Sequence, residues 1–304
     1  MWRRLQNKLE TKDLKQKLAA HVQYLSASIG ERNISHYENL ENAYRYIKTT
    51  LESFQIRVNS QNYQYQNKEV HNVIAEIQGT ADKDEVLIVG AHYDSVSGSP
   101  GADDNASGIA GLLELARLYR SIAPRHTIRF IAFTLEEPPV FGSSYMGSQY
   151  YASKLHANHD TVIGMICLEM IGYYTSKKGS QQHHPALASQ HQPGTGNFIA
   201  IVGDLNSKSL VYQVDEGIKM HSDIPTFAIA SHRWIPGVDL SDHASFWHYN
   251  YPAIMLTDTA YYRNPNYHSE DDTYDTLNYQ VFSKLITGLF KAIQHVDQNR
   301  TSND

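Results

Sequence analysis

Histidine and acidic side chains gather in residues 86–108, where an apolar run is followed by an acidic turn. His92 and Asp94 stand two residues apart at the end of the run, and residues 101–108 read Gly-Ala-Asp-Asp-Asn-Ala-Ser-Gly. Imidazole and carboxylate groups are ligands that zinc and similar divalent cations take in proteins. Without a cation, so many polar groups at the end of an apolar strand would be costly to bury. The segment therefore predicts part of a metal site.

Three later segments offer groups of the same kind. They contain Glu136 and Glu137 after the apolar run 131–135, Glu169 after 162–168, and His268 four residues before Asp272. Each group alone has an ordinary explanation, such as a solvated face or a helix cap. In doubly wound sheets, however, ligands collect at the carboxyl ends of the strands. The repeated placement after apolar runs favours one converging site.

Apolar periodicity indicates which elements carry these groups. Spacing of two residues or continuous apolar runs predict strands at 54–60, 70–77, 85–91, 127–135, 161–169, 197–203, 226–230 and 252–256. Helical spacing predicts helices at 14–26, 39–54, 105–121, 143–155, 207–219, 242–249 and 279–296. This alternation predicts an α/β fold with a largely parallel mixed sheet sandwiched between helices.

The chain has no linker that would divide it, so we expect a single globular domain over residues 1–304. The helices within 1–55 are expected to pack on this domain. Residues 174–196 are rich in Ser, Gln, Lys and His and predict a long loop near the cleft.

Composition excludes several classes of function. The net charge of −6 argues against nucleic acid or an anionic membrane as partner. A single cysteine rules out an intrachain disulfide, and no Gly-x-Ser-x-Gly sequence occurs for a serine hydrolase. The first residues lack the apolar stretch of a signal peptide. We expect a cytoplasmic location, or a secreted or periplasmic one if the sequence is a trimmed mature form; the oligomeric state is not indicated.

The order of the motifs is similar to that of a known family. The motifs are His-x-Asp at 92–94, Gly-Ala-Asp-Asp-Asn-x-Ser-Gly at 101–108, Glu-Glu at 136–137, Glu-Met-Ile-Gly at 169–172, Ser-Asp-His at 241–243 and His-x-x-x-Asp-Thr at 268–273. Over residues 70–278 the chain resembles the co-catalytic di-zinc aminopeptidases, metallopeptidase family 28, of leucyl and bacterial type. The resemblance implies a zinc-exopeptidase-like fold, two Zn²⁺ per chain and a peptide substrate.

The resemblance also implies which residues hold the metals. It makes Asp103 the carboxylate that bridges both ions, followed by a cis peptide bond to the next residue. His92 and Glu169 would complete one zinc site, and Glu137 with His268 the other. Many family members have aspartate where this chain has Glu169; the longer side chain is expected to reach the ion and to change its coordination.

Four further roles follow from the resemblance. Glu136 matches the general base, and Asp94 and Asp272 match carboxylates that orient the two histidine ligands. Tyr267, directly before the last histidine, matches a residue that stabilises the tetrahedral oxyanion, with simple packing as the alternative.

The predicted function is a zinc-dependent aminopeptidase that removes N-terminal residues from peptides. The alternatives are a glutaminyl cyclase-like enzyme with one zinc, a carboxypeptidase-type member of the same fold, and a non-catalytic domain of this fold. Cobalt and manganese remain candidates for the metal, because carboxylate-rich sites accept several divalent ions.

Overall fold

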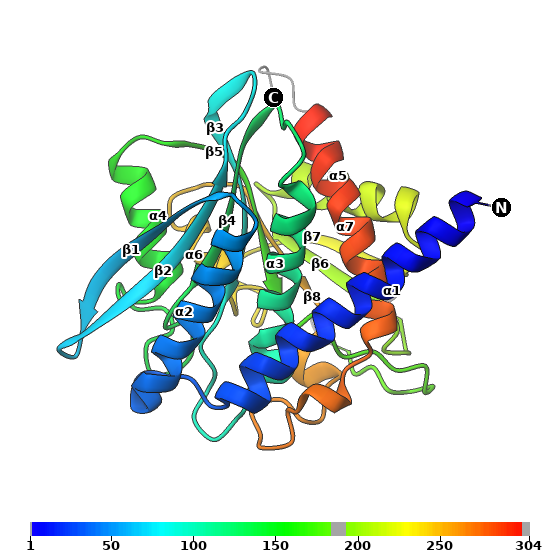
Figure 1. The fold of residues 1–304 in the computed structure, drawn as a ribbon, viewed down its shortest axis with the longest axis horizontal. Coiled ribbons are helices and arrows are strands. Elements are labelled where there is room, and N and C mark those ends of the chain that lie inside the picture. The colour runs from blue at the N-terminus through cyan, green and yellow to red at the C-terminus, as the bar shows by residue number, and fades with distance from the viewer. Residues whose placement is uncertain (1, 184–192, 300–304) are drawn as a thin grey trace.

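The central strand is apolar on both faces, which places it in the middle of the molecule. In β3 (Asp82–His92), Leu87 and Val89 face one hydrophobic core, and Val86 and Ile88 face a second core. A strand that is buried on both sides needs a layer of helices on each face. The computed structural model describes residues 2–183 and 193–299, with the backbone alone for 2–11, and shows this three-layer arrangement (Figure 1).

Eight strands form one mixed sheet in the order β1-β2-β4-β3-β5-β8-β6-β7. Strands β4, β3, β5 and β8 run parallel, and the hairpin β1–β2 and the pair β6–β7 extend the sheet at its two edges. The remaining strands are β1 (Arg57–Tyr65), β2 (Lys68–Ile77), β4 (His126–Phe133), β5 (Thr161–Glu169), β6 (Ile199–Asp204), β7 (Thr226–Ser231) and β8 (Ala253–Thr257). The predicted α/β fold with a largely parallel mixed sheet is confirmed.

The helices divide unequally between the two faces. One face is covered by α1 (Trp2–Gln23), α2 (Tyr37–Ser53), α3 (Gly108–Tyr119), α5 (Lys208–His221) and α7 (Tyr279–Asn299). The other carries α4 (Gly147–Ala157) and the short α6 (His243–Trp247). Helix α1 lies across α3 and α7 (Figure 1). Within the described chain, every helix is too short or too polar to span a bilayer.

Helix α3 begins later than the period predicts. The predicted helix starts at residue 105, but the backbone is non-helical at Asp104 and Asn105 and α3 begins at Gly108. The side-chain oxygen of Asn105 accepts the Gly108 N–H at 3.1 Å, while its amide group donates to the carbonyl of Leu168 at 2.8 Å. Asn105 therefore caps the helix and ties it to the end of β5.

Candidate metal centre

The candidate site lies at the carboxyl ends of three neighbouring parallel strands. His92 is the last residue of β3, Glu169 is the last residue of β5, and Glu136 and Glu137 follow β4 by three and four positions. Parallel strands end at the same edge of a sheet, so these four side chains meet although they are far apart in sequence. His268 reaches the same place from the loop that follows β8.

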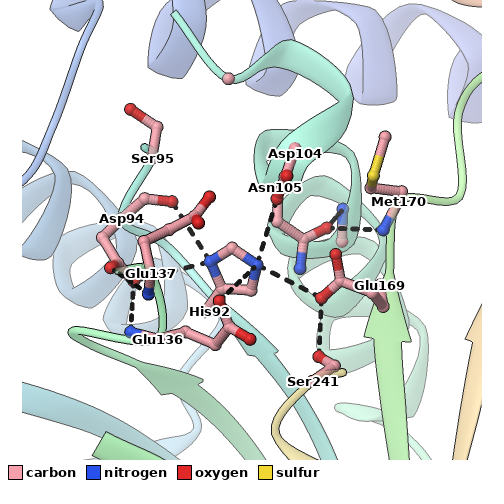
Figure 2. Close-up of polar contacts among 12 residues, drawn as sticks. His92, Asp94, Ser95, Asp104, Asn105, Glu136, Glu137, Glu169, Met170 and Ser241 are labelled. Carbon is pink, nitrogen blue, oxygen red and sulfur yellow. Dashed lines mark hydrogen bonds and ion pairs between the residues drawn. The ribbon is translucent and has the colours of Figure 1, made fainter. Parts of the chain in front are cut away.

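Two groups of potential ligands form at this edge, and they share one residue. His92 Nε2 lies 3.3 Å from Asp104 Oδ1 and 3.2 Å from Glu169 Oε2. On the other side, His268 Nε2 lies 3.1 Å from Asp104 Oδ2 and 3.5 Å from Glu137 Oε2. The two oxygens of Asp104 thus face different histidines, and each group brings three ligand atoms close enough to hold one ion. Figure 2 shows the first group around His92.

The predicted bridging residue is wrong by one position. Within the described chain, Asp103 forms no ion pair with either histidine; its carboxylate accepts the Gly172 N–H at 2.9 Å and the side-chain amide of Asn264 at 2.8 Å. Asp104 occupies the shared position, and the cis peptide bond likewise lies after Asp104 instead of after Asp103. Asp103 instead links the turn to the segments that follow Glu169 and precede His268.

The predicted role of Asp272 is also wrong in its contact. Its carboxylate was expected to orient His268, but it accepts the backbone N–H groups of Asp103 at 2.9 Å and Asp104 at 3.1 Å. Its own carbonyl accepts the N–H of Ala102 at 3.1 Å. Asp272 therefore fixes the turn that presents Asp104.

Asp94 supports the site in two ways. His92 Nδ1 forms a hydrogen bond with the backbone carbonyl of Asp94 at 3.2 Å, and Asp94 Oδ1 lies 3.5 Å from the same nitrogen. The two carboxylate oxygens of Asp94 also accept the backbone N–H groups of Glu136 at 3.1 Å and Glu137 at 3.0 Å. One buried carboxylate thus sets the positions of the histidine and of both glutamates. Leu135, directly before them, has a φ of +57°, so the chain turns sharply at this point.

The remaining predicted site residues lie in or beside the cluster. Glu137 Oε1 accepts the Val96 N–H at 3.1 Å, and Glu169 accepts the Ser241 hydroxyl at 2.7 Å. Glu136 Oε2 lies 3.9 Å from His92 Nε2, and these two residues with Glu137 form a third combination of possible ligands. The ring of Tyr267 is stacked on His268 with centroids 3.7 Å apart.

The electrostatics of the cluster fit a bound cation. Burial raises the pKa values of Glu136 and Glu137 well above their usual range, and burial also raises that of Glu169. Burial acts in the same direction on Asp104, but its contacts with the two histidines outweigh it and lower its pKa. Four carboxylates therefore surround two imidazoles, an excess of negative charge that a divalent ion would compensate.

One imidazole nitrogen without a hydrogen bond marks the same position. His92 Nε2 is buried and makes no hydrogen bond to any described residue, although carboxylate oxygens lie on two sides of it. Buried polar atoms normally have a partner. An imidazole nitrogen and carboxylate oxygens are a donor set suited to zinc, so the residues present fit the metal that the sequence predicts.

An apolar pocket opens beside the cluster. Its wall includes Glu169 and Tyr267, and its other lining is mostly apolar: Phe198, Ala200, Val202, Phe227, Ile229, Val238, Leu240 and Met255. Gln181 and Gln182, from the predicted loop 174–196, also line it, while residues 184–192 lie outside the described chain. The described part of this loop therefore contributes two side chains to the pocket wall.

Sequence reasoning missed one residue of this region. Arg32 is buried behind the turn 101–108 and donates to the Gly101 carbonyl at 2.7 Å. No motif of the sequence contains it, and it precedes His92 by 60 positions. Arg263, beside the pocket wall residue Phe198, is also buried and donates to Gln181 at 2.9 Å and to the carbonyl of Phe198 at 2.8 Å.

Comparison with known proteins gives relatives and a family. Protein YfbL of Escherichia coli K12 is 40% identical over 286 residues, which are 91% of this chain and 87% of that protein. A probable zinc metalloprotease of Pyricularia oryzae is 34% identical over 123 residues, 38% of this chain and 24% of that protein. The solved structure of a zinc aminopeptidase from Bacillus subtilis has a TM-score of 0.72 at 15% identity and covers 92% of this chain and 94% of that one. The model of peptidase family M28 matches residues 72–292, so the chain belongs to peptidase family M28.

Proposed function

We propose that this protein is an aminopeptidase that hydrolyses the N-terminal residues of peptides with two zinc ions and a glutamate base. One observation carries the proposal. The groups His92–Asp104–Glu169 and Asp104–Glu137–His268 share Asp104 through its two different oxygens. A carboxylate that faces two ligand groups in this way is the arrangement that two neighbouring ions require.

Each ion has its own ligands in this proposal. His92 and Glu169 would hold one zinc, Glu137 and His268 would hold the other, and Asp104 would serve both through its two oxygens. When bound, the two ions supply Lewis acidity that activates water and polarises the peptide carbonyl. Asp94 keeps the ring of His92 and the two glutamates in position through the contacts described above.

Glu136 is the proposed general base. Its carboxylate is buried and lies between the two ligand groups, 3.9 Å from His92 Nε2. Burial raises its pKa well above the usual value, which makes it a better proton acceptor. It takes a proton from the attacking water and then gives that proton to the amine that leaves when the peptide bond breaks.

Tyr267 is proposed to donate a hydrogen bond to the oxyanion of the tetrahedral intermediate. Its ring is held against His268 and forms part of the pocket wall. Burial and the nearby carboxylates raise its pKa far above 10, so the phenol keeps its proton at neutral pH and remains a donor.

The charge around the pocket favours binding of an amino terminus. Among the described residues that line the pocket there is no lysine or arginine, while Glu169 stands at its edge. A substrate carboxylate finds no cation there, whereas a protonated α-amine meets the carboxylate cluster. The apolar wall suits the side chain of the residue that is released.

A panel of matched peptides tests this proposal. Zinc-loaded protein is incubated with free and N-acetylated forms of the same peptides, and the products are identified by mass spectrometry. We expect release of single N-terminal residues from the free forms only. Cleavage of the acetylated forms from the C-terminal end would contradict the amino-terminal specificity. Formation of pyroglutamate from N-terminal glutamine, with one zinc per chain, would instead identify a glutaminyl cyclase-like enzyme.

A further inference from the structure

Arg32 is a buried cation that binds the loop 93–103, which joins two of the proposed ligands. It lies in the segment between α1 and α2, and its side chain has no exposed surface. Its Nε donates to the carbonyl of Tyr93 at 2.6 Å, its Nη1 to that of Pro100 at 2.6 Å, and its Nη2 to that of Gly101 at 2.7 Å. One guanidinium therefore contacts both ends of this loop.

Backbone contacts strengthen the same connection. The Arg32 N–H donates to the Ser95 hydroxyl at 3.2 Å, and the Arg32 carbonyl accepts the Ser95 N–H at 2.9 Å. The side-chain amide of Asn33 donates to the Ser95 carbonyl at 3.1 Å. The middle of the loop is thus held by the same short segment that holds its ends.

The turn is shaped around the guanidinium. Gly101 has a φ of +60°, and a Cβ atom at this position would lie 3.1 Å from Arg32 Nη2 and 2.3 Å from the carbonyl oxygen of Asp104. A side chain there would displace either the arginine or the backbone of the bridging ligand. The approach of Arg32 and the position of Asp104 are therefore coupled through one residue.

The charges on the two sides of the turn are complementary. Burial lowers the pKa of Arg32 to about 10, while the carboxylates of Asp94, Asp272 and Asp104 act to raise it, so it stays a cation at neutral pH. Arg32 binds carbonyl groups on one side of the turn, and Asp272 binds the N–H groups of Asp103 and Asp104 on the other.

We propose that Arg32 is a positioning residue that holds the loop 93–103 in the shape that brings His92 and Asp104 to the same metal ion. The inference rests on the proposed metal centre, and it adds to that centre a residue from outside the family match at 72–292. The N-terminal segment thus completes the site without touching the substrate or the reacting atoms.

Zinc affinity tests this role with a matched pair of variants. Arg32→Lys keeps the charge but loses the planar fork that reaches several carbonyls. Arg129→Lys is the control, because Arg129 is half-buried in β4 and pairs with Glu76 and Tyr151 away from the loop. Zinc binding is measured by competition with a chromogenic chelator, and Tm is measured with and without zinc. Steady-state kcat and KM are measured on an aminoacyl anilide.

We expect Arg32→Lys to weaken zinc binding about 10- to 100-fold, to shrink the rise of Tm that zinc causes, and to lower kcat more than it raises KM. The control should lower Tm equally in both states and keep the wild-type zinc affinity. A folded Arg32→Lys protein with wild-type zinc affinity would overturn the inference, as would an equal loss in the control.

If Arg32→Lys fails to fold, Ser95→Ala removes one contact of the same segment and must also weaken zinc binding; wild-type affinity there overturns the inference. Wild-type protein that binds no zinc would contradict the proposed function itself.

Discussion

Histidine and carboxylate side chains cluster at both ends of the strands β3 and β4, but only the cluster around His92 leaves a buried imidazole nitrogen without a hydrogen bond to the described residues. Where β3 and β4 begin, Asp297 from α7 accepts the backbone N–H of Arg125 at 2.9 Å, the backbone N–H of His126 at 2.9 Å and its Nδ1 at 3.0 Å. Asp82 is paired with the Arg125 guanidinium at 2.6 Å. Protein donors and one arginine therefore balance the carboxylates at this end.

The cluster at the opposite end is balanced differently. Around His92 the carboxylates of Asp104, Glu136 and Glu169 face one another and the imidazole, and His92 Nε2 makes no hydrogen bond to the described residues. Arg32 is close, but it is bound to backbone carbonyls. The same residue types thus build a structural link at one end and a site for a cation at the other. The difference lies in what satisfies the side chains.

The largest expected effect is a loss of kcat that occurs when the cluster around His92 is changed and not when the cluster around His126 is changed. Glu136→Gln should lower kcat by about 10²- to 10⁴-fold, because the amide accepts no proton from water. Zinc content should stay at the wild-type value, since Glu136 is the base and not a ligand in the proposal. The matched control is Glu85→Gln, whose carboxylate lies 3.6 Å from His126 at the other end. Loss of zinc in Glu136→Gln would identify Glu136 as a ligand, as the third ligand combination allows.

The next largest expected difference between the two clusters is in the number of zinc ions bound per chain. His268→Ala removes a ligand from one group only, so we expect the bound metal to fall from two ions per chain to one. His268 is partly exposed, whereas its partners Asp104 and Glu137 are buried, so its removal leaves both carboxylates in place for the remaining ion. His126→Ala at the other cluster should keep both ions. Elemental analysis after gel filtration distinguishes these results, and one ion per chain in the wild-type protein would remove the two-metal proposal.

Much of the fold follows from the sequence because burial leaves a periodic pattern. The continuous apolar run of β3 predicts a strand covered on both faces, and the strand has this environment. The start of α3 does not follow from the apolar periodicity. The backbone is non-helical at Asn105, whose side chain forms hydrogen bonds with the Gly108 N–H and the Leu168 carbonyl.

The chemical types of the site also follow from the sequence, but the exact atoms do not. Asp103 and Asp104 are adjacent and identical in chemistry, and only the backbone of the turn decides which carboxylate faces the histidines. Arg32 leaves no pattern at all, because its partners are backbone carbonyls, which every residue carries. Three-dimensional contacts of this kind are set by the fold and not by spacing.

Acid should release the metal more readily than ordinary carboxylates would allow. Burial raises the pKa values of Glu137 and Glu169, so protons compete with zinc at a pH above 4.5. Lowering the pH from 7.5 to 5.5 increases the protonated fraction of these two carboxylates, and we expect the zinc affinity to fall about tenfold or more. Isothermal titration at the two pH values measures this change. An affinity that is equal at both would show that neither glutamate is protonated in the metal-free site.

The smallest expected effect is a loss of stability when the cluster around His126 and Asp297 is changed, with the metal site left intact. The Asp297 carboxylate accepts three hydrogen bonds, and in Asp297→Asn an NH₂ group replaces one of its two acceptor oxygens. At least one donor loses its acceptor, which should lower the free energy of unfolding by about 2 kcal/mol. Urea denaturation measures this loss. The exposed pair of Asp223 and Lys284 gives a control, since Asp223→Asn should change stability by no more than about 0.5 kcal/mol. Zinc content and kcat should keep their wild-type values in both variants, because the hydrogen-bonding groups of the cluster around His126 have protein partners and hold no metal in the proposal. A loss of zinc in Asp297→Asn would mean that the two ends of the strands are not independent.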